Sequence, residues 1–355
     1  MIQLNQIYLL LLLVTMLPGC STIGYYSQAV SGHLSLMLAS QPVDNLLTAP
    51  ATDDELKRKL TIARDARHFA ERRLALPAGE AFTHYSELER PWVVVNLVAV
   101  PEFSLTPQQW CYPVIGCQAY RGYFSLEDAR REQRQFDRRD FDTFIGAVAA
   151  YSTLGWFDDP LHSGFTSLSD DRMVALMFHE LAHQVIYVDE DTAFNESFAT
   201  AVELEGLRLW LEERGESDQF TAALQRLSQR NQTLALVEHT SLELEALYGR
   251  EELPVERMRA RKKQIFTELI DRYNEMASEW DQPGPFGNAI ETLNNANIAL
   301  FRQYNQFVPG FRQLLKEQDY RFDAFFDEVR ALSELDREQR RLTLSALSQR
   351  FDEDL

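Results

Sequence analysis

The stretch His179-Glu180-Leu181-Ala182-His183 lies near the middle of a 355-residue chain and decides the expected fold. It belongs to an apolar, periodic segment, Asp170 to Tyr187, that predicts a helix. Histidines at positions i and i+4 project from one face of a helix, so both imidazoles can reach a single tetrahedral zinc ion. The alternative is a pair of ordinary histidines on a helix surface. On so apolar a helix the two imidazoles would be buried without polar partners, which is costly. A bound metal ion would provide such a partner for both rings.

A third ligand is expected from the segment Phe194-Asn195-Glu196-Ser197-Phe198-Ala199, in which Glu196 stands thirteen positions after His183. Asn195 is a good N-cap residue, which predicts that a second helix begins there and carries Glu196 in its first turn. A loop of about eight residues would let this helix return to the first one. In isolation, a glutamate near a helix start is explained equally well by the helix macrodipole. Together, His179, His183 and Glu196 predict a site for one Zn2+ with a position left open for water.

Glu180 lies between the two histidines and is the expected catalytic residue. It could accept a proton from a water molecule that the metal activates, and it could then return this proton to a leaving amine. These roles predict metal-assisted hydrolysis of peptides.

Further residues are candidates for supporting roles at such a site. Metal-binding histidines usually donate their second ring N–H to a carboxylate or a carbonyl, and Glu203 and Thr200 could accept it. Tyr151 is the candidate for substrate binding, and the small residues of Gly146 to Thr153 would let a peptide pair with that predicted strand. Each of these residues could equally be a packing residue. The candidate donors to the oxyanion that forms when water attacks a carbonyl are Tyr151, His162, Tyr187 and Tyr304.

The first nineteen residues predict a signal peptide rather than a part of the fold. Ile7 to Leu17 is an almost unbroken apolar run that is too short to span a bilayer, and it ends at Leu17-Pro18-Gly19-Cys20. This ending resembles a bacterial lipobox, in which the cysteine is acylated and becomes the mature N-terminus. Ser21 after Cys20 then implies the outer membrane, facing the periplasm. Pro18 and the absence of Lys or Arg before the run depart from the usual pattern, so a plain signal peptide or a buried helix is the alternative.

Two cysteines remain in the mature chain, Cys111 and Cys117. In an exported protein a lone close pair predicts a disulfide more than a metal site, and Pro113 and Gly116 suit a turn between them. A free buried pair is the alternative.

The composition excludes some classes of partner. The formal net charge is −19 and no Lys/Arg-rich run is present, so binding to nucleic acid is not expected. The acidity favours solubility, with selection of cationic substrates as the alternative.

The periodicity along the chain predicts an α+β protein that is predominantly α. Residues 1–19 form the signal peptide, residues 20–50 a segment close to the lipid, and residues 51–355 one domain. Within this domain we expect a mixed α/β part at 51–168, metal-binding helices at 169–213 and a helical part at 214–355. Apolar β-branched runs predict strands at 91–100 and 141–153. Helical periodicity is clearest at 53–76, 170–187, 195–213, 217–248, 254–280, 289–306 and 309–315.

The motifs also carry a resemblance to known families. HELAH followed by NESFA resembles the gluzincin metallopeptidases, which implies a zincin-like fold, although those families have a longer spacing between histidine and glutamate. A closer similarity is to bacterial lipoproteins described as predicted aminopeptidases. This similarity implies a peptide substrate, one zinc ion and anchoring to the cell envelope through Cys20. The shared blocks are CSTIGYY, WCYPVIGCQAYRGYF, AYSTLGWFDDP, HELAHQ, AFNESFAT and the NNA at Asn294 to Ala296.

Two other functions compete with an aminopeptidase. The first is an endopeptidase that uses the same chemistry on envelope proteins. The second is a zinc-binding scaffold without turnover, against which Glu180 argues, because a structural site has no use for a base and usually closes its fourth position.

Overall fold

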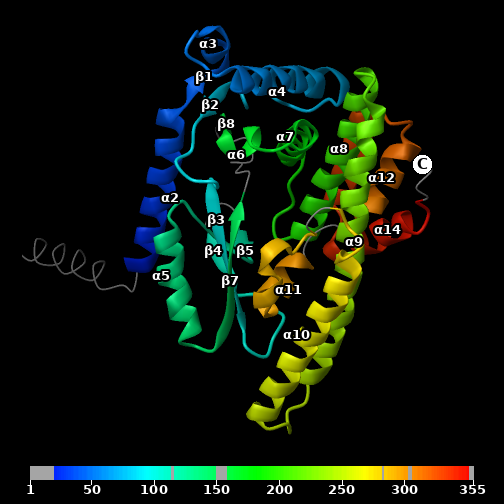
Figure 1. The fold of residues 1–355 in the computed structure, drawn as a ribbon. Coiled ribbons are helices and arrows are strands. Elements are labelled where there is room, and N and C mark those ends of the chain that lie inside the picture. The colour runs from blue at the N-terminus through cyan, green and yellow to red at the C-terminus, as the bar shows by residue number, and fades with distance from the viewer. Residues whose placement is uncertain (1–19, 113–115, 149–157, 282–283, 303–305, 352–355) are drawn as a thin grey trace, which may run out of the picture.

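The computed structural model describes residues 20–112, 116–148, 158–281, 284–302 and 306–351. Over these residues the protein is an α+β structure that is predominantly α, as the sequence predicts. The strands lie in the first half of the chain and the second half is helical (Figure 1). The predicted signal peptide, 1–19, falls outside the described residues.

The centre of the fold is the pair of helices α7 (Asp170–Val185) and α8 (Thr192–Glu213). Buried residues occur on nearly all sides of α8, which is the pattern of a helix enclosed by its neighbours. Helix α4 (Asp54–Arg73) covers α7, and α12 (Val308–Glu317) packs on α8 (Figure 1). The two central helices are therefore held from both sides.

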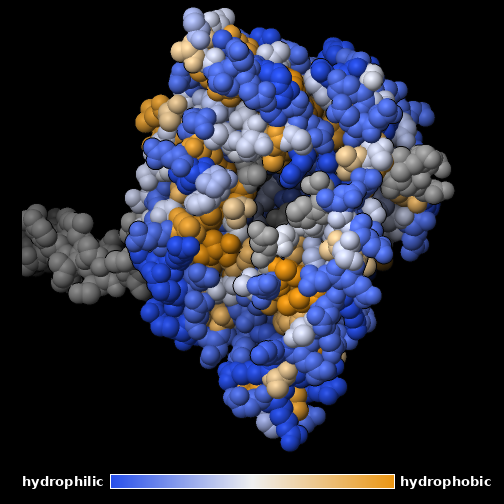
Figure 2. Space-filling model, viewed as in Figure 1, coloured by the Kyte–Doolittle hydropathy of each residue, from blue (hydrophilic) through white to orange (hydrophobic). Residues whose placement is uncertain are grey.

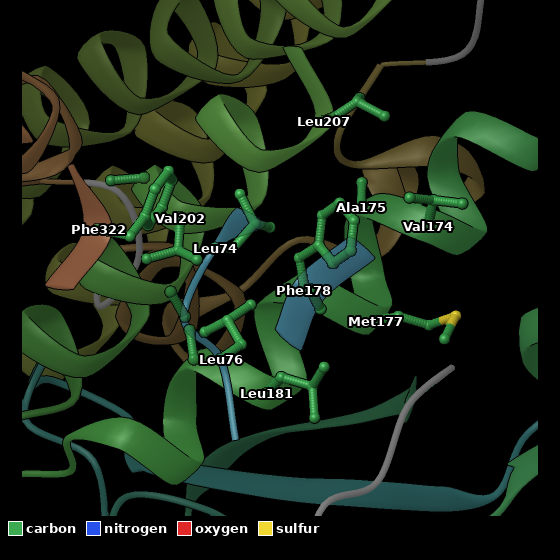
Figure 3. Packing of buried hydrophobic residues seen from close by; sticks show 14 of the residues in the cluster. Leu74, Leu76, Val174, Ala175, Met177, Phe178, Leu181, Val202, Leu207 and Phe322 are labelled. Atoms are coloured by element: carbon green, nitrogen blue, oxygen red, sulfur yellow. The ribbon is translucent and has the colours of Figure 1, made fainter. Parts of the chain in front are cut away.

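The largest hydrophobic cluster joins these helices. Phe178 and Leu181 of α7 lie among Leu74, from the end of α4, and Val202 of α8 (Figure 3). Each such side chain contributes about 1.5–3 kcal/mol when it is fully buried. This packing fixes α7 against α8. It thereby restricts the directions in which the polar side chains of both helices can point.

A three-stranded antiparallel sheet flanks this centre, in the order β6–β3–β7. Strand β3 (Val94–Pro101) lies between β6 (Arg121–Tyr123) and β7 (Phe141–Val148). The alternation of side chains along β3 sends Val95, Leu97 and Ala99 to one face, against α5 (Leu126–Asp137), and Val98 and Val100 to the other, against α11 (Asn295–Phe301). Of the strand predicted at 141–153, the part after Val148 lies outside the described residues.

Two smaller β units and one helix complete the first half. Strands β1 (Gln41–Pro42), β2 (His84–Ser86) and β8 (Leu161–His162) form a second sheet, and β4 (Trp110–Tyr112) pairs with β5 (Gly116–Gln118). A disulfide joins Cys111 to Cys117 across this hairpin. Helix α2 (Cys20–Ala39) runs along one edge of the molecule and packs on β6 and β2 (Figure 1). No helix among the described residues has the length and apolarity needed to cross a bilayer.

The second half contains one clear departure from the predicted helices. In the described part of 289–306, a 3-10 turn, η2 (Gly287–Thr292), and the short helix α11 replace the single predicted helix. Asn294 caps α11, and Asn297 completes a capping box with it, so the backbone leaves helical geometry between the two elements. The remaining elements are α3 (Val43–Thr48), α6 (Ser163–Thr166), η1 (Ser217–Gln219), α9 (Phe220–Tyr248), α10 (Val255–Ala277), α13 (Phe322–Ser333) and α14 (Arg337–Ser348).

Gly206 permits the close contact of α8 with the neighbouring elements. A Cβ atom at this position would lie 2.8 Å from Leu74 Cδ1 and 2.9 Å from Phe178 Cδ2. We therefore expect Gly206→Val to lower the free energy of unfolding by about 1–3 kcal/mol, because the extra carbons overpack the core. Urea denaturation measures this change. The control is Gly249→Ala, whose added Cβ meets only Glu245 O at 3.5 Å; equal stability of the two variants would contradict the prediction.

Candidate metal centre

Helix α7 presents two histidines on one face. The rings of His179 and His183 have centroids 4.9 Å apart and planes inclined by 82°, and their Nε2 atoms are 3.2 Å apart. The helix begins with Asp170 and Asp171, whose charges complement its positive end. Asp171 also pairs with Arg226 of α9 at 2.6 Å. The helix is thus fixed at its start, and the histidines follow in its last two turns.

Helix α8 brings Glu196 to the same point. Its Oε2 atom lies 3.4 Å from His179 Nε2, and its Oε1 atom lies 3.8 Å from His183 Nε2. All three potential ligand atoms lie within 4.8 Å of one another. Bonds of about 2.0–2.1 Å in a tetrahedron separate neighbouring ligand atoms by roughly 3.3–3.4 Å, so this donor set has the dimensions of a zinc site.

The connection between α7 and α8 is shorter than predicted, because α8 begins at Thr192 and Glu196 therefore lies beyond its first turn. The N-cap of α8 is Asp191, which accepts a hydrogen bond from Phe194 N at 3.2 Å, and Asn195 lies inside the helix. The Asn195 side chain instead holds the loop: Oδ1 accepts from Val188 N and Nδ2 donates to Val188 O, both at 2.8 Å. Because Asn195 precedes Glu196, this double hydrogen bond also fixes the backbone that carries the carboxylate.

Glu203 orients one of the two histidines. Its Oε2 atom lies 3.0 Å from His179 Nδ1, so Nδ1–H donates to Glu203 and the Nε2 atom faces the cluster. His183 Nδ1 is buried without a hydrogen-bond partner in the described parts of the chain. Thr200 is buried in α8 and has no hydrogen bond to either histidine within those parts. Of the two candidates from the sequence, Glu203 is therefore the one in place.

Burial sets the proton affinities in the cluster. It raises the pKa of Glu180 to about 7, although the charge of His179 acts in the opposite direction. It lowers the pKa of His183 to about 4. Burial alone would lower the pKa of His179, but Glu196 and Glu203 raise it well above its usual range. A carboxyl group with a pKa near neutrality can both accept and donate a proton at physiological pH.

The molecular surface is hollowed beside these helices. Figure 2 shows the hollow, which in the view of Figure 1 lies between α7 and α11 in one direction and between β7 and α9 in the other. Helix α7, which carries both histidines, borders it.

A family model with the description "Putative aminopeptidase" matches residues 24–344. The chain belongs to this family. The match spans the whole cluster, and the family's description indicates peptidase activity. Neither the search of curated proteins nor the search of solved structures returned a significant match.

Two tyrosines stand near the cluster of this family member. Tyr187 packs edge-on against His183, with ring centroids 6.3 Å apart, and its hydroxyl is hydrogen-bonded to Gln118. Tyr120, between β5 and β6, was not among the candidates from the sequence. Burial raises its pKa, and the charges of Glu196 and Glu180 add to this effect, so its hydroxyl stays protonated close to the carboxylates. The sequence offered one signal for Tyr120, its place in the block WCYPVIGCQAYRGYF.

Two more charged groups that the sequence did not single out act on the cluster. The pKa of Glu196 is lowered although burial acts to raise it, because His179 and His183 lower it. Arg230 of α9 adds to this lowering. Asp159, which is buried before β8, contributes to the raised pKa of Glu180 after burial itself. Both residues are far from the HELAH motif in sequence, so only the fold reveals their proximity.

The remaining candidates from the sequence are Tyr151, Tyr304 and His162. Tyr151 and Tyr304 fall outside the described residues. His162 is 1% exposed, and its Nδ1 atom accepts a hydrogen bond from Gly164 N at 3.1 Å as the N-cap of α6. Its Nε2 atom is buried without a partner within the described parts of the chain. The hydrogen bond that the structure shows for His162 thus stays within its own segment, at the start of α6.

The burial of His162 has a consequence for stability at acidic pH. Burial lowers its pKa to about 4, below the usual value of an unfolded chain near 6.5, so the folded state binds this proton less readily. The contribution of neutral His162 to the free energy of unfolding is therefore fully present above about pH 6.5. Up to about 3 kcal/mol of this free energy is lost as the pH falls toward 4.

The variant His162→Asn keeps an acceptor for Gly164 N–H and removes the titration. We expect its unfolding free energy to fall less between pH 6.5 and 4 than that of the parent, as measured by urea denaturation at each pH. His68→Asn, at an exposed position of α4, is the control. An unchanged pH dependence in His162→Asn would show that this histidine does not carry the effect.

Proposed function

We propose that this protein is a zinc-dependent peptidase with a zincin-like site, most simply an aminopeptidase of the bacterial cell envelope. The observation that carries the proposal is the convergence of His179, His183 and Glu196 from two packed helices, at the separations of zinc ligands, beside the buried carboxyl group of Glu180. The family description supports the peptidase class.

The residues of the chain divide the work of hydrolysis. His179, His183 and Glu196 would hold one Zn2+, which supplies a Lewis acid for the scissile carbonyl and for the attacking water. Glu180 takes the proton from that water and returns it to the leaving amine. Glu203 keeps His179 in the tautomer whose Nε2 faces the cluster.

The protonated hydroxyl groups of Tyr120 and Tyr187 provide candidate donors to the oxyanion that forms at the carbonyl carbon. Tyr187 packs on His183, and neither tyrosine needs to ionise to donate a hydrogen bond. Tyr187 was a candidate from the sequence, and Tyr120 joins it because of its electrostatic proximity to Glu180 and Glu196.

The location in the cell rests on the start of the sequence. The apolar run Ile7 to Leu17 and the lipobox-like ending at Cys20 lead to the proposal of a chain that is lipid-anchored, on the outer membrane and facing the periplasm. In a non-catalytic zinc scaffold, neither the buried Glu180 nor an open ligand position on the metal would have a role. This favours an enzyme over a scaffold.

The decisive experiment compares metal content and peptide hydrolysis in two variants. Glu180→Gln is expected to retain about one zinc per chain and to lose at least about 100-fold in kcat, because it can no longer accept a proton. His183→Ala is expected to lose both zinc and activity, since two ligands remain. Elemental analysis and a fluorogenic peptide assay measure the two quantities.

His239→Ala, at an exposed position of α9, is the matched control and should change neither quantity. Full activity in Glu180→Gln would rule out the mechanism. Substrates with free and acetylated amino termini distinguish an aminopeptidase from an endopeptidase. Cleavage of the acetylated peptides alone would contradict an aminopeptidase and indicate an endopeptidase.

The hydrogen bond from His179 to Glu203 gives a further prediction. Glu203→Gln should weaken zinc binding by about 10–100-fold, because the ligand histidine loses its charged partner. Competition with a fluorescent zinc chelator measures this affinity. Glu212→Gln, on an exposed part of the same helix, should leave it unchanged. Equal affinities in the two variants would remove Glu203 from the site.

A further inference from the structure

Helix α2 carries a stripe of exposed apolar side chains. Tyr26, Val30, Leu34 and Leu38 are 39%, 57%, 53% and 85% exposed. They follow one another at intervals of four residues, so they lie along one side of the helix over about 18 Å. Nine large hydrophobic side chains are exposed in the described parts of the chain, and four of them form this single stripe. Such a concentration distinguishes α2 from a surface with scattered apolar residues.

The opposite side of α2 already packs on the protein. Gln28 is hydrogen-bonded to the backbone of β6 and of the residue after it: Nε2 donates to Gly122 O, and Oε1 accepts from Phe124 N. Tyr25 packs on the ring of Tyr123, and Leu36 is buried. The fold therefore determines which side of the helix faces outward, and the apolar stripe is this outward side.

The helix is also free of charge. Its sequence, CSTIGYYSQAVSGHLSLMLA, contains no Asp, Glu, Lys or Arg, in a chain of which 25% is charged and whose net charge is −19. At that frequency, twenty consecutive residues without a charge are expected by chance well under 1% of the time. Next to the stripe the exposed residues are Ser27, Ser31 and Ser35. An uncharged helix with bulky apolar residues beside small hydroxyl residues can enter the interface of a bilayer without removing a charge from water.

We propose that the stripe of Tyr26, Val30, Leu34 and Leu38 docks on the surface of a lipid bilayer. The residue that the sequence predicts to be acylated, Cys20, is the first residue of this helix, so an anchor there would hold the stripe at the membrane. Stable attachment usually requires two signals, and the stripe supplies the second. The helix would then lie in the plane of the interface, because one side carries the stripe and the other packs on the protein.

A second copy of the chain is a weaker candidate for this surface. The stripe consists of four side chains, whereas a stable interface takes roughly 20–30 residues and 800 Å² from each partner. Binding of an anchored chain to a membrane requires no minimum buried area. Each apolar side chain that enters the bilayer adds its own favourable free energy of transfer.

This docking would orient the site that is described above. Helix α2 forms an edge of the molecule, whereas the hollow beside α7 opens on the face shown in Figure 2. With α2 on the bilayer, the hollow lies beside the membrane surface and stays open to the surrounding solution. The inference does not depend on the chemistry of the metal cluster, because it uses no residue of that cluster.

The test measures whether the stripe enters lipid. The full chain carries an environment-sensitive fluorophore at Leu34→Cys and, in a second preparation, at Leu342→Cys of α14, which is exposed to a matching 54%. The chain without an added cysteine measures background labelling. Each preparation is reconstituted in phosphatidylcholine vesicles with and without a spin-labelled lipid that quenches fluorescence. We expect a blue shift and at least about twofold quenching at position 34 and neither at position 342.

Variants of the stripe sharpen the test. Val30→Ser combined with Leu38→Ser should weaken the docked state at least about tenfold and thereby abolish lipid quenching at position 34. The same double change at Leu242 and Leu342, exposed leucines on other helices, should have no effect. Hydrolysis of soluble peptides should be the same in all of these variants, which also shows that they fold.

Three outcomes would overturn the proposal. Absence of lipid quenching at position 34 would show that the stripe stays in water. A blue shift without vesicles that grows with protein concentration, together with a dimeric mass, would assign the stripe to a second copy. Quenching that requires anionic lipid and disappears at high salt would contradict docking by an uncharged helix. The fluorescence result holds whether or not the chain hydrolyses peptides.

Discussion

The structure depends on the packing of α7 against α8, because this one interface holds both the core and the polar cluster. Phe178 and Leu181 bury their side chains on one side of α7, while His179 and His183 point to Glu196 on the other. Polar groups in such surroundings are costly unless they have partners. The carboxylates of Glu196 and Glu203 provide part of that compensation, and His183 Nδ1 remains without a partner in the described chain.

The precision of the cluster comes from contacts outside it. Asn195 ties the loop before Glu196 to Val188, and Asp191 caps α8 and forms a buried ion pair with Arg340 of α14 at 2.8 Å. An ion pair between buried groups fixes position more than it adds stability. The C-terminal helices thus help to place Glu196, although they contribute no group to the cluster.

Much of this arrangement follows from local sequence. The spacing of HELAH and the apolar residues around it predicted α7 and its two histidines. The prediction failed at Asn195 and at 289–306. Asn195 has the propensity of an N-cap, but Asp191 takes this role because its carboxylate can also pair with Arg340. Asn294 breaks the predicted last helix by forming a capping box with Asn297.

By itself the sequence determined what is periodic or adjacent: the helices, the one-turn separation of His179 and His183, and the uncharged composition of α2. Only the tertiary structure decided which distant groups meet. Tyr120, Asp159 and Arg230 act on the cluster through space, and no periodicity or motif spacing connects them to it in the sequence. The physical reason is range. Helical periodicity and capping act over a few residues, whereas burial and electrostatic interaction depend on the packing of the whole chain.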